Sequence, residues 1–125
     1  MVQPRPLIAV LDDEPKFCKA LGRLLKTHGF EVELFELGDE LLAACATRAP
    51  DCLLLDLHMP GINGFQVLER LAALRLPMPV IVITGHDQPD DAERVRALGA
   101  VDYLLKPLDE SRLLAALGSV IEAAD

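Results

Sequence analysis

The stretch Leu7–Leu11, with the sequence LIAVL, is an unbroken apolar run, and the acidic residues Asp12-Asp13-Glu14 follow it directly. Two further runs, residues 52–55 (CLLL) and 80–83 (VIVI), are also apolar at consecutive positions. A strand carries apolar side chains on both sides when helices cover both faces of its sheet, as in parallel α/β sheets. The three runs therefore predict the central strands of a parallel sheet.

Two more runs, residues 32–35 and 101–105, bring the expected strands to five. The former lies in the alternating stretch Glu31-Val32-Glu33-Leu34, which is typical of an edge strand with one wetter face. Stretches of helical period separate the runs, at about residues 15–28, 38–47, 67–74, 89–98 and 113–121. Such alternation requires right-handed crossovers. We therefore expect an α/β fold: a flavodoxin-like, doubly wound sheet of five parallel strands in the order 2-1-3-4-5, with helices on both faces.

Length and composition indicate one small domain. The chain has 125 residues, of which 51% are hydrophobic and 26% charged, and we expect a single domain over 1–125 with its core at about 7–121. A net charge of −8 repels nucleic-acid phosphates, so no direct nucleic-acid binding is expected. No apolar run approaches the roughly 20 residues of a membrane helix. Three cysteines without a C-x-x-C pair indicate a reducing compartment, so we expect a cytoplasmic protein that does not bind membranes.

Polar side chains gather where the expected strands end. Asp12 and Asp13 follow the first strand, and Asp56, Thr84 and Lys106 stand at the ends of the third, fourth and fifth. In a doubly wound sheet the ligand site lies beyond these carboxyl ends, at the switch point between the first and third strands. Three carboxylates at one rim repel one another unless a cation compensates them. Lys106 is one candidate and a divalent ion is the other, and oxygen ligands without thiolates favour Mg²⁺.

The same residues suit phosphoryl transfer. Three carboxylates, one Mg²⁺ and one lysine sum to zero charge, and an aspartyl phosphate at Asp56 adds about one negative charge. The metal is therefore needed more after the transfer than before it. The reaction asks for a nucleophile, a metal, a cation and a hydroxyl donor. Asp56, Mg²⁺, Lys106 and Thr84 are the candidates for these roles, in that order.

Four motifs together point to a known family. They are VLDDE at 10–14, LLDLHMPGINGF at 54–65, VIVITGH at 80–86 and AVDYLLKPL at 100–108. Any one of them alone is weak, but all four in this order and spacing are specific. The chain resembles the receiver domain of the response regulators of two-component signalling, from about residue 7 to residue 121.

The resemblance implies a role for each residue of the site. Asp56 would accept the phosphoryl group and would also be a Mg²⁺ ligand. Asp13 would bind the ion directly, and Asp12 would bind it mainly through water. The backbone carbonyl of His58 would be a further metal ligand. Lys106 would contact the phosphoryl group from a position ahead of a cis proline.

The resemblance also implies a switch and its partners. The hydroxyl of Thr84 would move to a phosphoryl oxygen, and Tyr103 would then turn inward and change the output surface. The phosphoryl donor would be a histidine kinase or a phosphotransfer protein, and the signal would pass to an output domain or a downstream protein. Phosphorylation would favour a homodimer. The domain would not be an enzyme, beyond catalysing its own phosphorylation and dephosphorylation.

The residues leave alternatives open. A small Mg²⁺-dependent phosphatase or phosphotransferase would also use an aspartyl nucleophile, although the chain has no insertion that would form a substrate pocket. A constitutive protein-binding module of the same fold would need none of the polar strand ends. A flavin-binding module is disfavoured because Asp12-Asp13-Glu14 would repel the flavin phosphate. Finally, His58, His86 and Asp56 could form a transition-metal site.

Overall fold

The sheet and its helices follow the expected alternation. The computed structural model describes residues 5–124. The elements, in chain order, are β1 (Leu7–Leu11), α1 (Pro15–Thr27), β2 (Glu31–Phe35), α2 (Gly38–Thr47), β3 (Cys52–Asp56), α3 (Gly64–Ala73), β4 (Val80–Thr84), α4 (Asp91–Ala97), β5 (Asp102–Leu105) and α5 (Glu110–Ala124). All neighbouring strands pair in parallel, and their order is β2-β1-β3-β4-β5. The predicted fold class and strand order are therefore confirmed.

Burial of the strands explains their composition. Every residue of β1, β3 and β4 is buried, because these three strands have neighbours on both sides and helices on both faces. The two edge strands, β2 and β5, are partly exposed. In β2 Glu31 is exposed and Val32 is half-buried, as the alternating sequence predicts for an edge strand, but Leu34 of the apolar set is itself 43% exposed.

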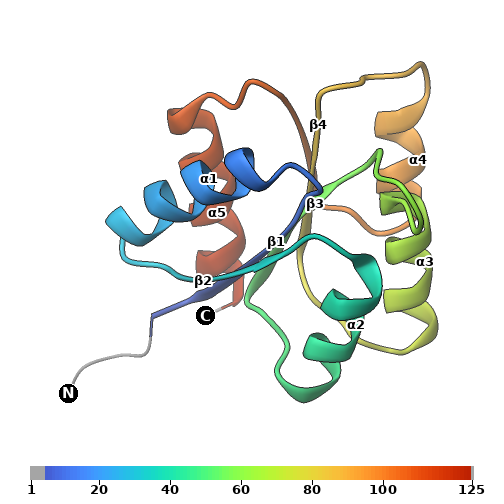
Figure 1. Ribbon diagram of the computed structural model, residues 1–125, viewed down its shortest axis with the longest axis horizontal. Coiled ribbons are helices and arrows are strands. Elements are labelled where there is room, and N and C mark those ends of the chain that lie inside the picture. Colours follow the sequence, from blue (N-terminus) through green and yellow to red (C-terminus); the bar gives the residue numbers. More distant parts are fainter. Residues whose placement is uncertain (1–4, 125) are drawn as a thin grey trace.

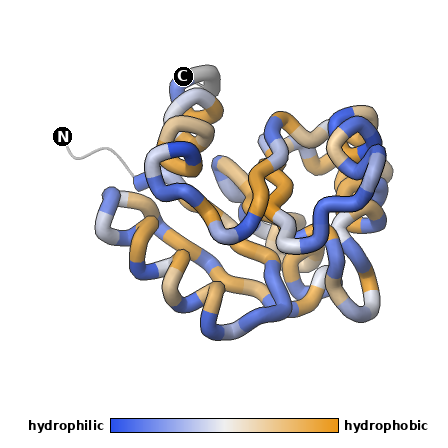
Figure 2. The backbone as a smooth tube through the Cα atoms, turned by 90° about the horizontal axis from the view of Figure 1, so that it is seen from above, coloured by the Kyte–Doolittle hydropathy of each residue, from blue (hydrophilic) through white to orange (hydrophobic). Residues whose placement is uncertain are grey.

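Two helical layers enclose the sheet. Helices α1 and α5 cover one face, and α2, α3 and α4 cover the other (Figure 1). Each face has its own core, so Leu54 of β3 packs with Leu25 of α1 while its neighbour Leu55 packs with Leu71 of α3. The apolar segments of the chain run through the inside and the hydrophilic ones border it (Figure 2). Consecutive apolar residues in a strand thus pack against the helical layers on opposite faces of the sheet.

Several boundaries differ from the sequence expectation. Helix α3 begins at Gly64 and not near residue 67, and α5 spans Glu110–Ala124 and not residues 113–121. Helix α4 begins at Asp91 and not near Pro89, because Asp90 has a left-handed backbone with a φ of 69° that interrupts a helix. Strand β5 begins at Asp102 and not at Val101, whose backbone N–H still bonds the carbonyl of Val80. The side chain of Val101 is 53% exposed.

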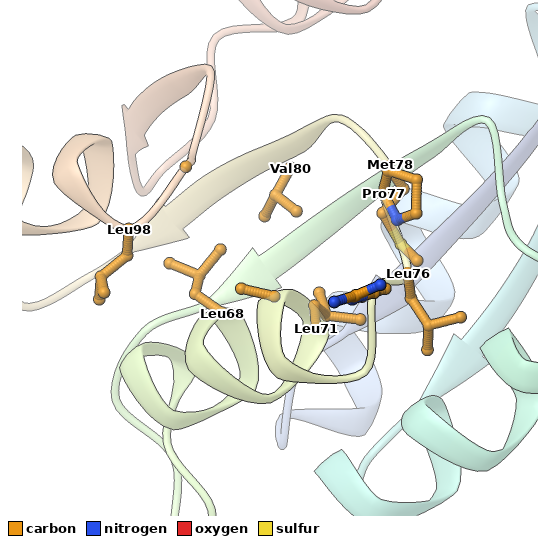
Figure 3. A pocket seen from close by; sticks show the side chains of 10 residues that line it. Leu68, Leu71, Leu76, Pro77, Met78, Val80 and Leu98 are labelled. Atoms are coloured by element: carbon orange, nitrogen blue, oxygen red, sulfur yellow. The ribbon is translucent and has the colours of Figure 1, made fainter.

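The end of the sheet at which the strands begin carries an apolar pocket. Leu68 and Leu71 of α3, Met78 before β4, and Leu98 after α4 contribute to its lining (Figure 3). These residues lie toward the amino ends of the strands, away from the acidic residues that follow β1 and β3. In the described part of the chain, no helix has the length and hydropathy to cross a membrane.

Candidate functional site

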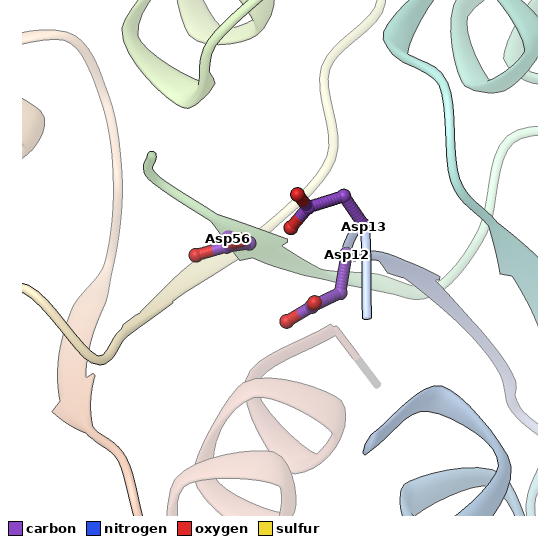
Figure 4. A group of neighbouring side chains, drawn as sticks. All are labelled: Asp12, Asp13 and Asp56. Atoms are coloured by element: carbon purple, nitrogen blue, oxygen red, sulfur yellow. The ribbon is translucent and has the colours of Figure 1, made fainter. Parts of the chain in front are cut away.

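Three carboxylates meet where β1 and β3 end. Asp12 and Asp13 follow β1, Asp56 is the last residue of β3, and the two strands are paired neighbours. One oxygen of each side chain lies within 4.8 Å of the others (Figure 4). Asp12 is fully buried and Asp56 is 4% exposed, whereas Asp13 is more open to solvent. The sequence expectation that these residues share one rim agrees with this geometry.

Burial and charge act together on Asp56. Loss of water around the carboxyl group, followed by repulsion from Asp12, raises the pKa of Asp56 to about 7. Lys106 opposes this rise and Asp13 adds to it. A cation near the three carboxylates would favour the ionised form of Asp56, which is the form that acts as a nucleophile.

Lys106 supplies a positive charge to the same rim. Its Nζ donates to Asp12 Oδ2 at 2.6 Å and to Glu14 Oε1 at 3.3 Å, and it lies 4.2 Å from the centroid of the Phe17 ring. Burial alone would lower the pKa of this amine, but the hydrogen bond to Asp12 and the charge of Asp56 raise it above its usual range. The lysine is therefore held charged, and the peptide bond to Pro107 is cis.

The loop after Asp56 folds back tightly against it. The backbone N–H of Gly64 donates to the carbonyl of Leu57 at 2.9 Å. A Cβ at position 64 would lie 2.7 Å from the Asp56 carbonyl oxygen, which is closer than side chains approach backbone. Asn63 and Gln66 then start α3 with a reciprocal capping box. Gly64 and this cap together hold the loop against Asp56.

Thr84 and Tyr103 lie on neighbouring strands. Thr84 ends β4, is 1% exposed, and its Oγ1 accepts a hydrogen bond from the backbone N–H of His86 at 3.1 Å. Tyr103 belongs to β5, and its hydroxyl donates to Asp87 Oδ1 at 2.7 Å. Burial, followed by this hydrogen bond, raises the pKa of the Tyr103 phenol above its usual range. Both side chains are thus engaged with the segment that joins β4 to α4.

Two of the three histidines, His58 and His86, follow the ends of β3 and β4. His58 Nε2 is 3.1 Å from Asp91 Oδ2, and the ring centroids of His58 and His86 are 6.3 Å apart. Among residues 5–124, Asp12, Asp13 and Asp56 form the one group of three side chains with metal-ligand spacing. The alternative of a transition-metal site at the histidines therefore gains no support from the geometry.

Sequence reasoning missed three acidic partners. Glu14 accepts from Lys106, Asp87 accepts from Tyr103, and Asp91 is paired with His58. An acidic residue near a helix start is favoured by the helix dipole whatever else it does. Nothing in the sequence distinguishes these contacts from that general preference.

The donor set fits a hard divalent cation. The three converging groups offer carboxylate oxygens, and none of the converging side chains is a thiol or an imidazole. Oxygen ligands of this kind suit Mg²⁺ or Ca²⁺ rather than zinc or copper. The charge of the rim also favours a cation, since three carboxylates outnumber one lysine.

The comparisons with known proteins agree with this geometry. The family model of the response regulator receiver domain matches residues 8–118. The transcriptional regulatory protein FixJ of Bradyrhizobium diazoefficiens is 36% identical over 118 residues, which are 94% of this chain and 58% of FixJ. Protein PilH of Pseudomonas aeruginosa is 38% identical over 116 residues, 91% of this chain and 96% of PilH. A CheY-like receiver domain from Methanospirillum hungatei superposes with a TM-score of 0.89 at 25% identity, over 96% of each chain.

Fold and acidic rim together define a signalling domain of the doubly wound α/β class. The chain belongs to the response regulator receiver domain family of two-component systems. Members of this family are signalling switches rather than catalytic enzymes, and they generally bind Mg²⁺ at an acidic pocket. They partner with histidine kinases and output domains.

Proposed function

We propose that this chain is a switch that phosphorylation of Asp56 turns on. The donor is a histidine kinase or a phosphotransfer protein, and Mg²⁺ is the cofactor. The observation that carries the proposal is the convergence of Asp12, Asp13 and Asp56 within 4.8 Å beside the amine of Lys106. The output is a change at the surface of α4, β5 and α5, read by an output domain or a downstream protein.

Each residue has a chemical task in this proposal. An Asp56 oxygen attacks the phosphorus of a phosphohistidine, the P–N bond breaks, and its electrons leave with the imidazole nitrogen, which takes up a proton. Asp13 would bind the metal directly and Asp12 mainly through water. Asp56 and the backbone carbonyl of His58 would be the further protein ligands. Mg²⁺ would supply positive charge to the phosphoryl oxygens. Lys106 offsets the remaining charge at the same oxygens.

Thr84 and Tyr103 form the proposed switch pair. Once Asp56 carries the phosphoryl group, the Thr84 hydroxyl donates to one of its oxygens and gives up its contact with His86. Tyr103 then leaves Asp87 and turns inward. The phosphoryl group shifts this equilibrium only by its different contacts with the two arrangements. A homodimer of the phosphorylated form is part of the proposal.

The alternatives are less well supported. A phosphatase or phosphotransferase would use the same aspartyl nucleophile, but the family model that matches residues 8–118 is that of the receiver domain. A constitutive binding module would not require the buried carboxyl groups of Asp12 and Asp56. The three cysteines are buried and free, which supports a cytoplasmic location, and the net charge of −8 supports a domain that leaves nucleic acid to its partners.

Phosphate incorporation tests the proposal directly. The wild type, Asp56→Asn and Asp90→Asn would be incubated with acetyl phosphate and Mg²⁺, and the phosphoryl group measured by intact mass. Asp90 is an exposed aspartate with a left-handed backbone that asparagine also adopts, so it is a matched control. We expect incorporation in the wild type and in Asp90→Asn, and none in Asp56→Asn. Equal incorporation in all three would exclude Asp56 as the acceptor.

A further inference from the structure

A hydrogen bond outside the acidic cluster joins the acceptor loop to α4. His58 Nε2 lies 3.1 Å from Asp91 Oδ2. An ionised carboxylate only accepts, so the ring nitrogen carries the proton and donates it. His58 stands two residues after Asp56, and Asp91 is the first residue of α4. One bond therefore connects the loop that carries the acceptor to the helix at the proposed output surface.

A second contact lies on the same face of α4. The guanidinium carbon of Arg94 is 3.9 Å from the centroid of the Phe65 ring, near the start of α3. Arg94 follows Asp91 by three residues, so both side chains project from one side of the helix. The His58 ring also meets the Phe65 ring edge-on, with centroids 6.3 Å apart. We call these two contacts, His58–Asp91 and Phe65–Arg94, the α4 clamp.

A helix-start preference does not account for all the contacts of Asp91. Its carboxylate accepts from the backbone N–H of Gln88 at 3.2 Å, which lies before α4 and closes the turn there. A general preference for acidic residues near a helix start does not explain the bond from His58, which comes from another element. The side chain of Asp91 is 10% exposed, so its carboxylate has lost most of its water and depends on these donors. Removing one of these donors should therefore destabilise this arrangement.

We propose that Asp91 is a positioning residue of the acceptor site, which acts through His58 and opposes the switch. The clamp belongs to the arrangement described here, in which Thr84 is engaged with His86 and Tyr103 with Asp87. A phosphoryl group at Asp56 selects the other arrangement, and the clamp opens with it. This consequence rests on the proposed function, whereas the link between the loop and α4 does not.

Binding of beryllofluoride, a phosphoryl mimic, tests the effect on the switch. Calorimetric titrations with Mg²⁺ present would compare the wild type, Asp91→Ala, Asp91→Asn and Glu93→Ala. Asp91→Ala should bind beryllofluoride about fivefold more tightly than the wild type. The reason is that the arrangement competing with the bound form has lost one part-buried hydrogen bond. Asp91→Asn keeps an oxygen that accepts from His58 and should bind like the wild type. Glu93→Ala, which removes an exposed carboxylate from the same turn, should also be unchanged.

A merely structural role gives a different result. If Asp91 only stabilised the fold, Asp91→Ala would unfold more easily but bind beryllofluoride no more tightly. That outcome, or equal tightening in Glu93→Ala, would overturn the positioning role.

Amide hydrogen exchange tests the link without any phosphoryl mimic. In His58→Ala and in Asp91→Ala, exchange of the α4 amides should each rise about fivefold. The double variant should exchange more slowly than the product of the two single effects predicts, since both changes break the His58–Asp91 bond. Only Asp91→Ala also removes the bond from Gln88. Multiplying effects, or unchanged exchange in Asp91→Ala, would refute the link. If the wild type failed to bind beryllofluoride, the proposed function would be refuted. The comparison of the two single variants with the double variant would still decide whether His58 and Asp91 are coupled.

Discussion

At the scale of single residues, the acidic rim balances repulsion against one lysine. Asp12 is fully buried, and two donors reach it: the amine of Lys106 and the backbone N–H of Glu14. Asp56 is nearly as buried, and burial raises its pKa to about 7. The fold thus holds charge that it does not fully neutralise. A cation that binds here gains from relieving the repulsion.

The pKa of Asp56 predicts a pH-dependent stability difference. In the folded chain this carboxyl keeps its proton up to about pH 7, whereas in the unfolded chain it loses it near 3.8. The native state therefore binds more protons between these values, and this group's stabilisation is lost as pH rises through the window. Asp56→Asn removes the effect, so its advantage over the wild type should grow from pH 4 to 7. The full shift corresponds to about 4 kcal/mol, and solvent screening of this partly accessible site reduces the expected advantage to about 2 kcal/mol. Urea denaturation with EDTA measures it.

Mg²⁺ provides the check on that prediction. A divalent ion favours the ionised carboxylates, so millimolar Mg²⁺ should stabilise the wild type at pH 7 and reduce the advantage of Asp56→Asn. A constant difference between the two proteins across pH 4 to 8 would contradict the raised pKa of Asp56.

Removing the lysine should expose the cost of burying Asp12. In Lys106→Met the carboxylate of Asp12 loses its charged partner, and breaking such a pair from one side costs about 3 kcal/mol. The side chain of Lys106 is 12% exposed, so water replaces it poorly. Lys19→Met, at an exposed lysine of α1, should change stability by less than about 0.5 kcal/mol. Urea denaturation with and without Mg²⁺ measures both variants. Equal stability of the two would show that Lys106 does not support Asp12.

At the scale of elements, the β3–α3 loop is held by close backbone packing and by a helix cap. Gly64 brings the backbone against Asp56 and Leu57, and the Asn63–Gln66 capping box fixes where α3 begins. The loop after β4 is held differently, by side chains: Asp87 bonds Tyr103 at its middle. Backbone packing thus positions the loop at Asp56, whereas side-chain hydrogen bonds hold the loop that leads to α4.

Two glycine-to-alanine variants separate these effects. In Gly64→Ala the new Cβ would lie 2.7 Å from the Asp56 carbonyl oxygen and 2.8 Å from Leu57 Cα, so backbone must move at the acceptor. We expect a loss of about 2 kcal/mol of stability and slower phosphorylation by acetyl phosphate. In α5, Gly118→Ala meets nothing within 4 Å and should stabilise by about 0.5 kcal/mol. Thermal unfolding and incorporation rates measure both. A Gly64→Ala protein with normal stability would contradict the close packing of this loop.

At the scale of the whole molecule, one sheet separates two independent cores. The α1 and α5 layer and the α2, α3 and α4 layer have no buried residue in common. The acidic rim and the apolar pocket of Figure 3 lie at opposite ends of the strands. The rim can therefore be rearranged while the layers stay packed.

Separate cores predict additive losses. Leu25→Val in α1 and Leu71→Val in α3 each remove one methylene and should cost about 1 kcal/mol. The double variant should lose the sum within about 0.5 kcal/mol, because the two sites share no packing partner. Denaturant unfolding of the four proteins gives the coupling energy. A coupling of 1 kcal/mol or more, in either direction, would mean that the sheet transmits packing strain between its faces.

Most of the fold follows from the strands. A strand that is buried on both faces has apolar residues at consecutive positions, and this pattern predicts the central parallel strands. A strand that is buried on one face alternates, and the alternation around Val32 predicts an edge strand. The acidic rim also follows, since parallel strands bring their carboxyl ends to one edge. The partners of Asp87 and Asp91 do not follow. They depend on how the loop before α4 turns, and the left-handed backbone of Asp90 that shapes this turn has no sequence signal.

The hydrogen bond between Tyr103 and Asp87 has a practical consequence. The chain contains one tyrosine and no tryptophan, so its ultraviolet emission comes from this single ring. A carboxylate that takes the phenol proton in the excited state quenches that emission, and the light should brighten when the ring turns away from Asp87. Stopped-flow fluorimetry on the unlabelled protein would then time the turning of one side chain, separately from the arrival of the phosphoryl group.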